Sequence, residues 1–219
     1  MQNNKKTDEN KPLHVLHVFG RLNRGGAESR VMDLYRNVDR TRIQFDFMQH
    51  TTKVCDFQTE IEQLGGKVYH VPPFRFWNYF SYCKAWKQFI KEHPEIRIVH
   101  GHMTSTASIY LPIVRKKGVF TIAHSRNAGV DKGIKGKLTK FLRRNLKEKC
   151  DRCFACSKLA GEAVFGKKAM EQGRVTIIPN AIDAARFTFD PEVRRQKREE
   201  LHIQPEELPV SYTHLRAHE

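Results

Sequence analysis

The feature that most constrains the fold of this chain is a repeated alternation of short, β-branched apolar runs with longer segments of helical spacing. The apolar runs occupy residues 13–19, 43–50, 67–71, 97–103, 119–125, 152–157 and 175–179. Between them the apolar residues recur at helical intervals, as in 79–93, a segment that stops before Pro94. Strands that alternate with helices in this way predict an α/β fold, a Rossmann-like doubly wound parallel sheet covered on both faces.

Ligands of such sheets bind at the carboxyl ends of the strands, so the residues that follow each predicted strand are the candidates for chemistry. Gly25 and Gly26 follow the first strand and precede a predicted helix. Glycines there can adopt positive φ and bring backbone amides close to a ligand, and a helix N-terminus favours an anion such as a diphosphate. An ordinary strand-to-helix turn explains the same two residues equally well.

The net charge of +15 indicates an anionic partner, which nucleic acid, an anionic membrane surface or a phosphorylated ligand would each satisfy. Residues 1–11 are polar and lack the apolar core of a secretory signal, which predicts a disordered lead-in to a cytoplasmic protein. No run approaches the roughly 18 apolar residues that a membrane-spanning helix needs.

The five cysteines make an odd count in a chain without an export signal, which predicts reduced thiols. Cys150, Cys153 and Cys156 have a spacing found at iron–sulfur clusters. However, alanine stands at position 160, where that pattern needs a further cysteine. We therefore expect these residues to be buried thiols.

The most basic segment, 132–149, holds eight Lys or Arg residues against one acid, Glu148. Its apolar residues at helical spacing are Leu138, Phe141, Leu142 and Leu146. A basic amphipathic helix can lie on an anionic membrane, where each cation contributes about 1 kcal/mol. A sheet-covering helix with a solvated charged face is the alternative. The membrane-facing candidates are Lys135, Lys137, Lys140, Arg143, Arg144 and Lys147. Nucleic acid is not the expected partner, because the chain has no recognition module.

Four motifs follow one another along the chain: GGAE after the first strand, the histidine of TIAHSRN, the serine-ended strand of CFACSKLAGEAVF, and IPNAID followed by Phe. Together they resemble the family-4 GT-B glycosyltransferases, particularly bacterial capsule and exopolysaccharide enzymes, over about residues 12–210. The resemblance implies the N-terminal, acceptor-side half of a GT-B fold. It also implies a retaining transferase that moves a sugar from a nucleotide-sugar donor, UDP-linked, to a glycan or lipid-linked acceptor in cell-surface polysaccharide synthesis.

The same resemblance carries roles to single residues. Gly25 and Gly26 match positions that hold the donor diphosphate. His124 matches a catalytic histidine near the donor sugar and the attacking hydroxyl, although a hydrogen-bonded strand-end histidine would explain it otherwise. The other positions carried over are Glu28, His102 and Arg126 as residues of the acceptor or donor pocket, and Asn180 and Asp183 as structural residues before the interdomain hinge.

No cofactor is implied beyond the nucleotide-sugar co-substrate, and no metal is predicted. His100, His102 and His124 follow or end neighbouring strands, but no further ligand with zinc-site spacing accompanies them. We therefore expect them in the acceptor pocket or in the core.

The chain is expected to divide into the lead-in (1–11), the Rossmann-like acceptor-side domain (12–190), a linker helix (191–210) and a foreign tail (211–219). Similar enzymes continue into a donor-binding domain with paired glutamates and a basic pair for the departing diphosphate. Leaving-group stabilisation is a large part of such catalysis, so we expect the fragment to be inactive alone. The expected location is the cytoplasm, peripheral on the inner face of the plasma membrane.

Two alternatives remain at this point. One is a non-catalytic Rossmann-like module that binds an anionic partner, either a membrane surface or RNA. The other is a sugar-nucleotide epimerase of the same fold.

Overall fold

The computed structural model describes residues 11–127, 129 and 133–210. The predicted tail (211–219), and the predicted lead-in except for Lys11, lie outside these residues. The chain separates into two units, Met1–Ala181 and Ile182–Glu219, and each is described by itself. The first unit ends earlier than the boundary predicted at residue 190.

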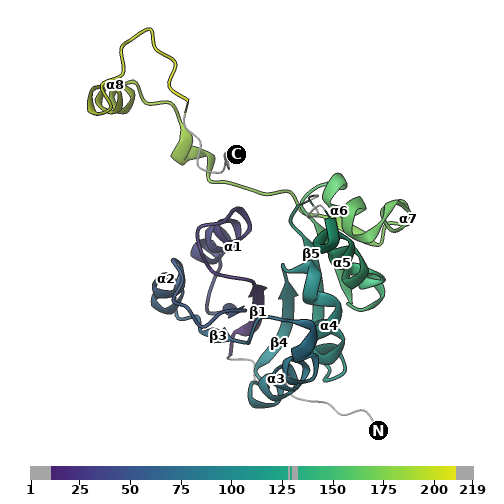
Figure 1. Cartoon of the computed structure of the whole chain (residues 1–219). Coiled ribbons are helices and arrows are strands. Elements are labelled where there is room, and N and C mark those ends of the chain that lie inside the picture. Colours follow the sequence, from purple (N-terminus) through teal and green to yellow (C-terminus); the bar gives the residue numbers. More distant parts are fainter. Residues whose placement is uncertain (1–10, 128, 130–132, 211–219) are drawn as a thin grey trace. The chain divides into compact units, whose positions relative to one another are not determined.

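The first unit is built on one sheet of seven strands in the order β3-β2-β1-β4-β5-β6-β7 (Figure 1). The strands are β1 (Leu13–Phe19), β2 (Ile43–Gln49), β3 (Val68–His70), β4 (Ile96–Gly101), β5 (Phe120–Ser125), β6 (Arg152–Ala155) and β7 (Val175–Ile177). All neighbouring strands are parallel. The seven predicted strands and the Rossmann-like sheet are therefore confirmed.

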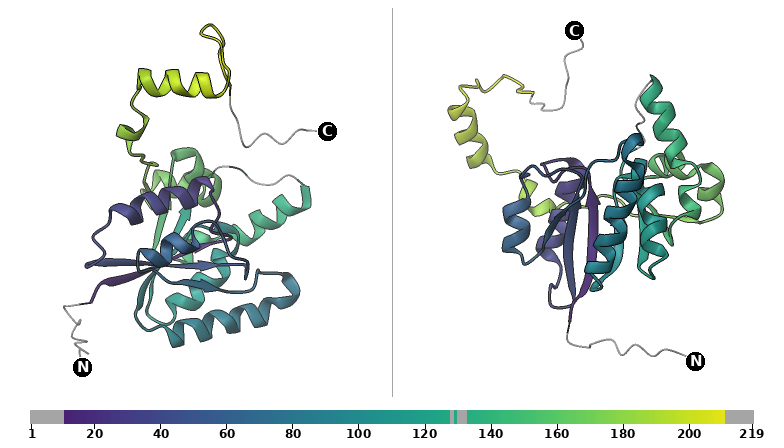
Figure 2. Two further views of the ribbon diagram at one scale, coloured as in Figure 1. Left: turned by 90° about the vertical axis from the view of Figure 1, so that its left-hand side faces the viewer. Right: turned by 60° about the horizontal axis from the view of Figure 1, so that its bottom comes forward.

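Helices cover both faces of this sheet, as the right-hand view of Figure 2 shows for the helices nearest β1. One face carries α1 (Gly26–Asn37) and α2 (Gln58–Gln63); the other carries α3 (Tyr79–Glu92), α4 (Thr104–Arg115), α6 (Lys158–Phe165) and α7 (Lys167–Glu171). Each long helix turns one apolar stripe inward. In α3 this stripe is Tyr82, Cys83, Trp86, Phe89 and Ile90, at helical spacing.

Alternation along β1 assigns its side chains to the two cores. Leu16 and Val18 pack into the core under α3 and α4, whereas Val15 and Phe19 pack into the core under α1 and α2. Successive side chains of a strand point to opposite faces, so His17 lies on the α1 side with Val15 and Phe19. The strand thus places a histidine inside an otherwise apolar core.

The end of β4 is closed by a helix on the opposite face. A side chain at Gly101 would collide with the hydroxyl of Tyr110 on α4. The Tyr110 ring in turn stacks on Trp86 of α3, with ring centroids 4.5 Å apart and an interplanar angle of 12°. Because only glycine fits, α4 packs directly against the carboxyl end of β4.

Helix α5 (Gly133–Arg143) packs against α4 and is shorter than the basic segment predicted. Asn145 adopts a left-handed conformation (φ 58°), which ends the helical path, and Leu146 is buried in the separate turn η2 (Leu146–Glu148). Phe141 is 67% exposed. The predicted single stripe through Phe141 and Leu146 is therefore wrong, because asparagine tolerates the left-handed turn that divides it.

The second unit contains the turn η3 (Ala184–Phe187) and the helix α8 (Pro191–Glu200). Asp183 caps the first by accepting a hydrogen bond from the amide of Ala185 at 3.2 Å. Asp190 caps α8 in the same manner, with Pro191 in the first turn. Among the described residues, no helix combines the length and the apolar character needed to cross a membrane.

Candidate functional site

The strand order reverses direction between β1 and β4. From β1 the chain proceeds to β2 and β3 on one side, and then returns to place β4 on the other side of β1. Parallel sheets bind ligands at the carboxyl edge beside such a reversal. His17 of β1 and His100 of β4 are register partners across this junction.

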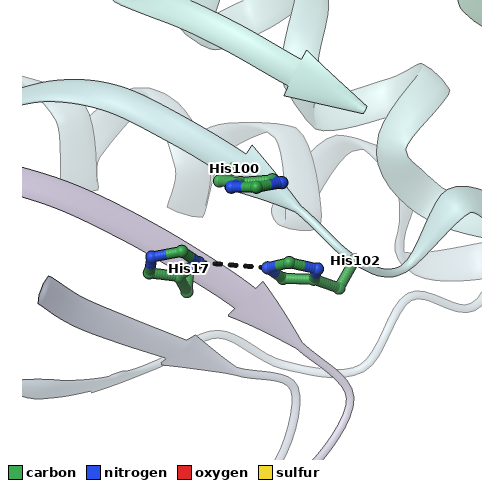
Figure 3. A group of neighbouring side chains, drawn as sticks. All are labelled: His17, His100 and His102. Atoms are coloured by element: carbon green, nitrogen blue, oxygen red, sulfur yellow. Dashed lines mark hydrogen bonds between the residues drawn. The ribbon is translucent and has the colours of Figure 1, made fainter. Parts of the chain in front are cut away.

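Four histidines gather at this edge, on the face of the sheet that α1 covers. They are His17, His100, His102 and His124. Figure 3 shows three of them, with the ring of His100 above the pair formed by His17 and His102. The rings of His100 and His102 stack with centroids 4.4 Å apart. These residues are far apart in the sequence, on or directly after β1, β4 and β5. The parallel pairing of these three strands brings them together.

The hydrogen bonds assign the tautomers of two of these rings. Nε of Arg126 donates to Nδ1 of His102 at 3.1 Å, so in a neutral ring the proton of His102 lies on Nε2. That Nε2–H donates to Nδ1 of His17 at 3.0 Å. His17 therefore carries its proton on Nε2, a buried atom without a hydrogen-bond partner that lies in a ring packed 4.3 Å from Phe45.

All four imidazoles are held neutral. Burial, followed by the positive charge of Arg126, lowers the pKa of His17 and of His124 to about 3. Burial and the neighbouring histidines hold the pKa values of His100 and His102 well below their ordinary range. A cluster of this kind offers neutral donors and acceptors at physiological pH and adds no charge.

His124 is the member of the cluster that lies on β5, next to the outer strand β6. Its Nδ1 lies 3.0 Å from Nε2 of His100, and the Phe154 ring meets it edge-on with centroids 5.8 Å apart. Its Nε2 is buried and has no hydrogen-bond partner in the structure. A buried imidazole nitrogen without a partner costs stability, which marks it as a candidate to hydrogen-bond a ligand.

Arg126 is the cation of the site and connects three strands. Besides His102, its Nη1 donates to Oδ1 of Asn180, after β7, at 3.2 Å. Burial raises the pKa of Glu28 against the opposing attraction of the Arg126 guanidinium. The structure thus brings the predicted pocket residues Glu28, His102 and Arg126 to one edge and adds Asn180 as a direct partner.

The helix start at Gly25 and Gly26 differs from its prediction in one respect. Gly25 is extended (φ −101°, ψ 166°), and Gly26 is the first residue of α1, so neither adopts the positive φ that we expected. A side chain at Gly25 would meet the carboxylate of Glu28, whereas one at Gly26 would meet nothing within 4 Å. Glycine at position 26 therefore leaves open space over the N-terminus of α1. Glu28 lies beside this space.

His17, His100 and His102 also form a candidate metal group, because one ligand nitrogen of each lies within 4.8 Å of the others. The hydrogen bonds oppose this use. A proton lies between His17 and His102, and the Arg126 guanidinium donates to the far side of His102. A divalent ion would have to displace that proton beside a fixed positive charge. The absence of a metal stays a prediction.

The predicted membrane-facing residues of α5 lie in a different region. Lys137, Lys140 and Arg144 are exposed, Arg143 and Lys147 are half-buried, and the side chain of Lys135 is outside the described residues. The helix connects the end of β5 to the start of β6, so it runs from the carboxyl edge to the amino edge. Arg144 and Lys147 therefore lie toward the edge opposite His124.

Sequence reasoning missed His17. The available signal was strand alternation, which places His17 on the same face as Phe19 and next to the predicted strand that carries His100. The buried-thiol prediction is confirmed for Cys150 and Cys153, whereas the free thiol of Cys156 is only half-buried.

Comparison with known proteins gives matches along most of the chain. Residues 24–186 match the family described as Glycosyltransferase Family 4. The chain is 32% identical over 210 residues to EpsF of Bacillus subtilis (strain 168), a glycosyltransferase by name, and the match covers 94% of this chain and 54% of EpsF. It is 30% identical over 91 residues to the capsular polysaccharide biosynthesis glycosyltransferase CapH of Staphylococcus aureus, covering 42% of this chain and 24% of CapH.

Solved structures with the same fold include a glycosyltransferase from Rickettsia africae ESF-5, with a TM-score of 0.64 and 13% identity over 89% of this chain and 51% of that chain. Anabaena HepE in complex with UDP-glucose matches with a TM-score of 0.62 and 13% identity, over 86% of this chain and 50% of that one. These likenesses show the fold, one Rossmann-like half of a GT-B architecture. The chain spans about half the length of EpsF and of both structures.

Proposed function

This chain belongs to Glycosyltransferase Family 4, and from that premise we propose that its protein transfers a sugar from a UDP-linked donor to a glycan or lipid-linked acceptor, with retention of anomeric configuration. Support for the donor comes from HepE, whose structures hold UDP and UDP-glucose on the same fold. Support for a role in cell-surface polysaccharide synthesis comes from the name of CapH.

The observation that carries the proposal is the unpartnered Nε2 of the buried, neutral His124 at the carboxyl edge. A neutral imidazole can hydrogen-bond a sugar or acceptor hydroxyl without adding charge near the departing diphosphate. The amides at the start of α1, beside Gly26, would hold a phosphate. The acceptor hydroxyl would attack the anomeric carbon on the face that the diphosphate leaves, with no enzymic nucleophile assigned.

Arg126 has a supporting role in this arrangement. Its guanidinium fixes the tautomer of His102 and contributes a positive charge next to Glu28. The anionic donor would enter beside this charge, so we assign Arg126 to donor or acceptor positioning. No metal is needed for this scheme.

The donor-binding part is proposed to lie in sequence that the chain does not include, because the chain spans about half of EpsF. We expect residues 1–219 alone to give little or no transfer, since leaving-group stabilisation would come largely from that part. The protein is proposed to work in the cytoplasm at an anionic membrane surface, the source of a lipid-linked acceptor.

The test uses the full-length protein, with transfer from UDP-sugars measured by the anomeric signals of the product in NMR. His124→Ala should lower transfer by roughly 10²-fold or more, the loss expected when an oriented catalytic group is removed, and this loss should exceed its effect on folding. His93→Ala, outside the cluster, is the matched control. Unchanged transfer in His124→Ala would discard the histidine role, and a donor sugar altered without transfer would favour an epimerase.

A further inference from the structure

Two of the buried cysteines, Cys150 and Cys153, bring their sulfur atoms into contact and are here called the thiol pair. Their Sγ atoms lie 3.6 Å apart. The S–H of Cys150 also donates to the carbonyl of Leu146, with the sulfur 3.4 Å from the oxygen. A disulfide needs its sulfur atoms about 2.05 Å apart, so the pair closes with a movement of only about 1.5 Å.

The thiol pair lies where η2 leads into β6, at the amino edge of the sheet. Cys153 is a residue of β6, whereas Cys150 lies just before it, in neither a helix nor a strand. Between them, the carboxylate of Asp151 accepts hydrogen bonds from the amide of Thr121 at 2.8 Å and from its hydroxyl at 2.7 Å. The main chain between the two cysteines is therefore held to β5, while the irregular backbone at Cys150 leaves room for the short movement that closes the pair.

A pocket of about 320 Å³ lies over the thiol pair and is lined by both cysteines. Its lining also contains Arg115, Lys147 and Arg174. Less than a tenth of either cysteine is exposed, so the pocket is their route to solvent. It admits a molecule as small as hydrogen peroxide and excludes a bulky thiol reagent from the core.

The surroundings of the two sulfur atoms differ in a way that gives them different roles. A hydrogen bond from the S–H of Cys150 lowers the pKa of Cys153; burial opposes this, and the positive charges of Arg174 and Lys147 add to it. The same interaction, together with burial, raises the pKa of Cys150. Cys153 is therefore the residue that loses its proton, and the thiolate is the nucleophilic form of cysteine.

Other uses of two neighbouring cysteines fit these observations less well. Zinc takes three or four ligands, but the two acids of the pocket, Glu148 and Asp151, are already paired with Arg174 and Arg115 at 2.8 Å each. Core packing, the use that the sequence predicts, accounts for the burial of both thiols. It does not account for the pocket that both of them line or for the cations in its lining.

We propose that Cys150 and Cys153 form a reversible redox site that a hydroperoxide, such as hydrogen peroxide, oxidises to a disulfide. The thiolate of Cys153 attacks one peroxide oxygen, the O–O bond breaks, and the hydroxide that leaves takes a proton from solvent to become water. The sulfur of Cys150 then attacks the sulfenic acid on Cys153, and its proton leaves with the hydroxyl group as a second water. Two thiols and one peroxide thus give one disulfide and two waters.

The site does not depend on the proposed transfer, since it lies at the edge of the sheet opposite His124. A dithiol reductant reverses the disulfide by thiol–disulfide exchange. Low pKa, access to solvent and a second thiol within reach are the properties of cysteines that respond reversibly to oxidants. The thiol pair combines all three.

Peptide mapping of the oxidised full chain locates the bond. Trypsin separates the two cysteines into peptides 150–152 and 153–158, so a bond between Cys150 and Cys153 joins these peptides. The folded chain, treated with equimolar hydrogen peroxide and then blocked with N-ethylmaleimide, should give the linked peptides, and dithiothreitol should separate them. Fragmentation distinguishes Cys153 from Cys156, and Cys156→Ser is the matched control that should still form the bond. A bond to Cys156 instead, or no linked peptides from the unsubstituted chain, overturns the proposal.

Two further measurements test the roles of the sulfur atoms. Limiting iodoacetamide on the reduced Cys156→Ser chain should label Cys153 at least about tenfold faster than Cys150, since one pKa unit alone changes the thiolate fraction tenfold. In Cys150→Ala the sulfenic acid on Cys153 has no second thiol to attack it, so dimedone should trap it there, whereas the unsubstituted chain should give the disulfide and little dimedone adduct. Equal dimedone labelling of the two chains overturns the proposal, as does faster alkylation of Cys150.

Discussion

Nε2 of His100 lies 3.0 Å from Nδ1 of His124, and both rings are neutral, so a single proton lies between them. This bond fixes the plane of the His124 ring. It also decides whether the unpartnered Nε2 of His124 donates or accepts, because a neutral imidazole carries only one proton. His100 is therefore a positioning residue for His124.

Replacing His100 tests that role. His100→Leu leaves Nδ1 of His124 buried without a partner, so transfer by the full-length protein should fall roughly tenfold, the cost of one lost buried hydrogen bond. His100→Gln keeps a donor and an acceptor and should recover part of the rate. Initial rates of sugar transfer give the answer. Equal rates for the Leu and Gln variants, at equal thermal stability, would show that the bond has no positioning role.

The neutral cluster predicts that acid destabilises the fold. The pKa of His17 and of His124 is about 3 in the folded chain and near 6.5 in the unfolded chain. Between those values the unfolded chain binds more protons, so the free energy of unfolding falls as pH falls. Each histidine contributes a slope that grows as pH falls through 6.5 and approaches about 1.4 kcal/mol per pH unit near pH 5. Urea unfolding at pH 7, 6 and 5 measures it, and His17→Gln should reduce the slope. A free energy independent of pH in this range contradicts the prediction.

Zinc should not bind tightly to the trio of His17, His100 and His102. The proton between His17 and His102, and the Arg126 guanidinium on His102, both oppose a divalent ion. We expect the thermal midpoint of unfolding to be unchanged by stoichiometric Zn²⁺ or by a chelator, and the native mass to show no bound ion. A saturable rise of the midpoint that His17→Gln abolishes would establish a metal site.

Alanine should leave the stability unchanged at one glycine and lower it at another. A Cβ at Gly26 meets nothing within 4 Å, so Gly26→Ala should keep stability while it narrows the space over the start of α1. A Cβ at Gly66 would lie 2.6 Å from the carbonyl of Phe45, so Gly66→Ala should cost about 1–3 kcal/mol. Calorimetric titration with UDP-sugar on the full-length protein should then show weaker binding for Gly26→Ala. Unchanged affinity would place the diphosphate elsewhere.

The strands of this fold were predictable because a parallel strand that is buried on both faces consists of a run of apolar residues. The break at Asn145 was not, because a left-handed residue leaves no mark in the spacing of Leu142 and Leu146. The exposure of Trp77 was hidden for a related reason. Its neighbours have the composition of a core segment, and only the turn closed by Asn78 shows that they point outward.

The histidine site was predictable only in part. Position at the end of a strand singled out His102 and His124, but the proton chain through His17 depends on the register of β1 with β4. Register is a property of pairing between segments distant in sequence. The contact of Arg126 with Asn180 is likewise set by the order of β5, β6 and β7 and by no local pattern.

The collision that glycine avoids at position 101 has a consequence for how this sequence can diverge. The hydroxyl of Tyr110 occupies the space of the missing side chain, so the two positions share one volume. Relatives with alanine at position 101 should lack the hydroxyl at position 110. The simplest such change there is tyrosine to phenylalanine. Gly101→Ala should be tolerated poorly alone and better together with Tyr110→Phe. The two positions would then change together in an alignment of relatives. The cause would be the volume that the two side chains share, since neither residue belongs to the histidine site.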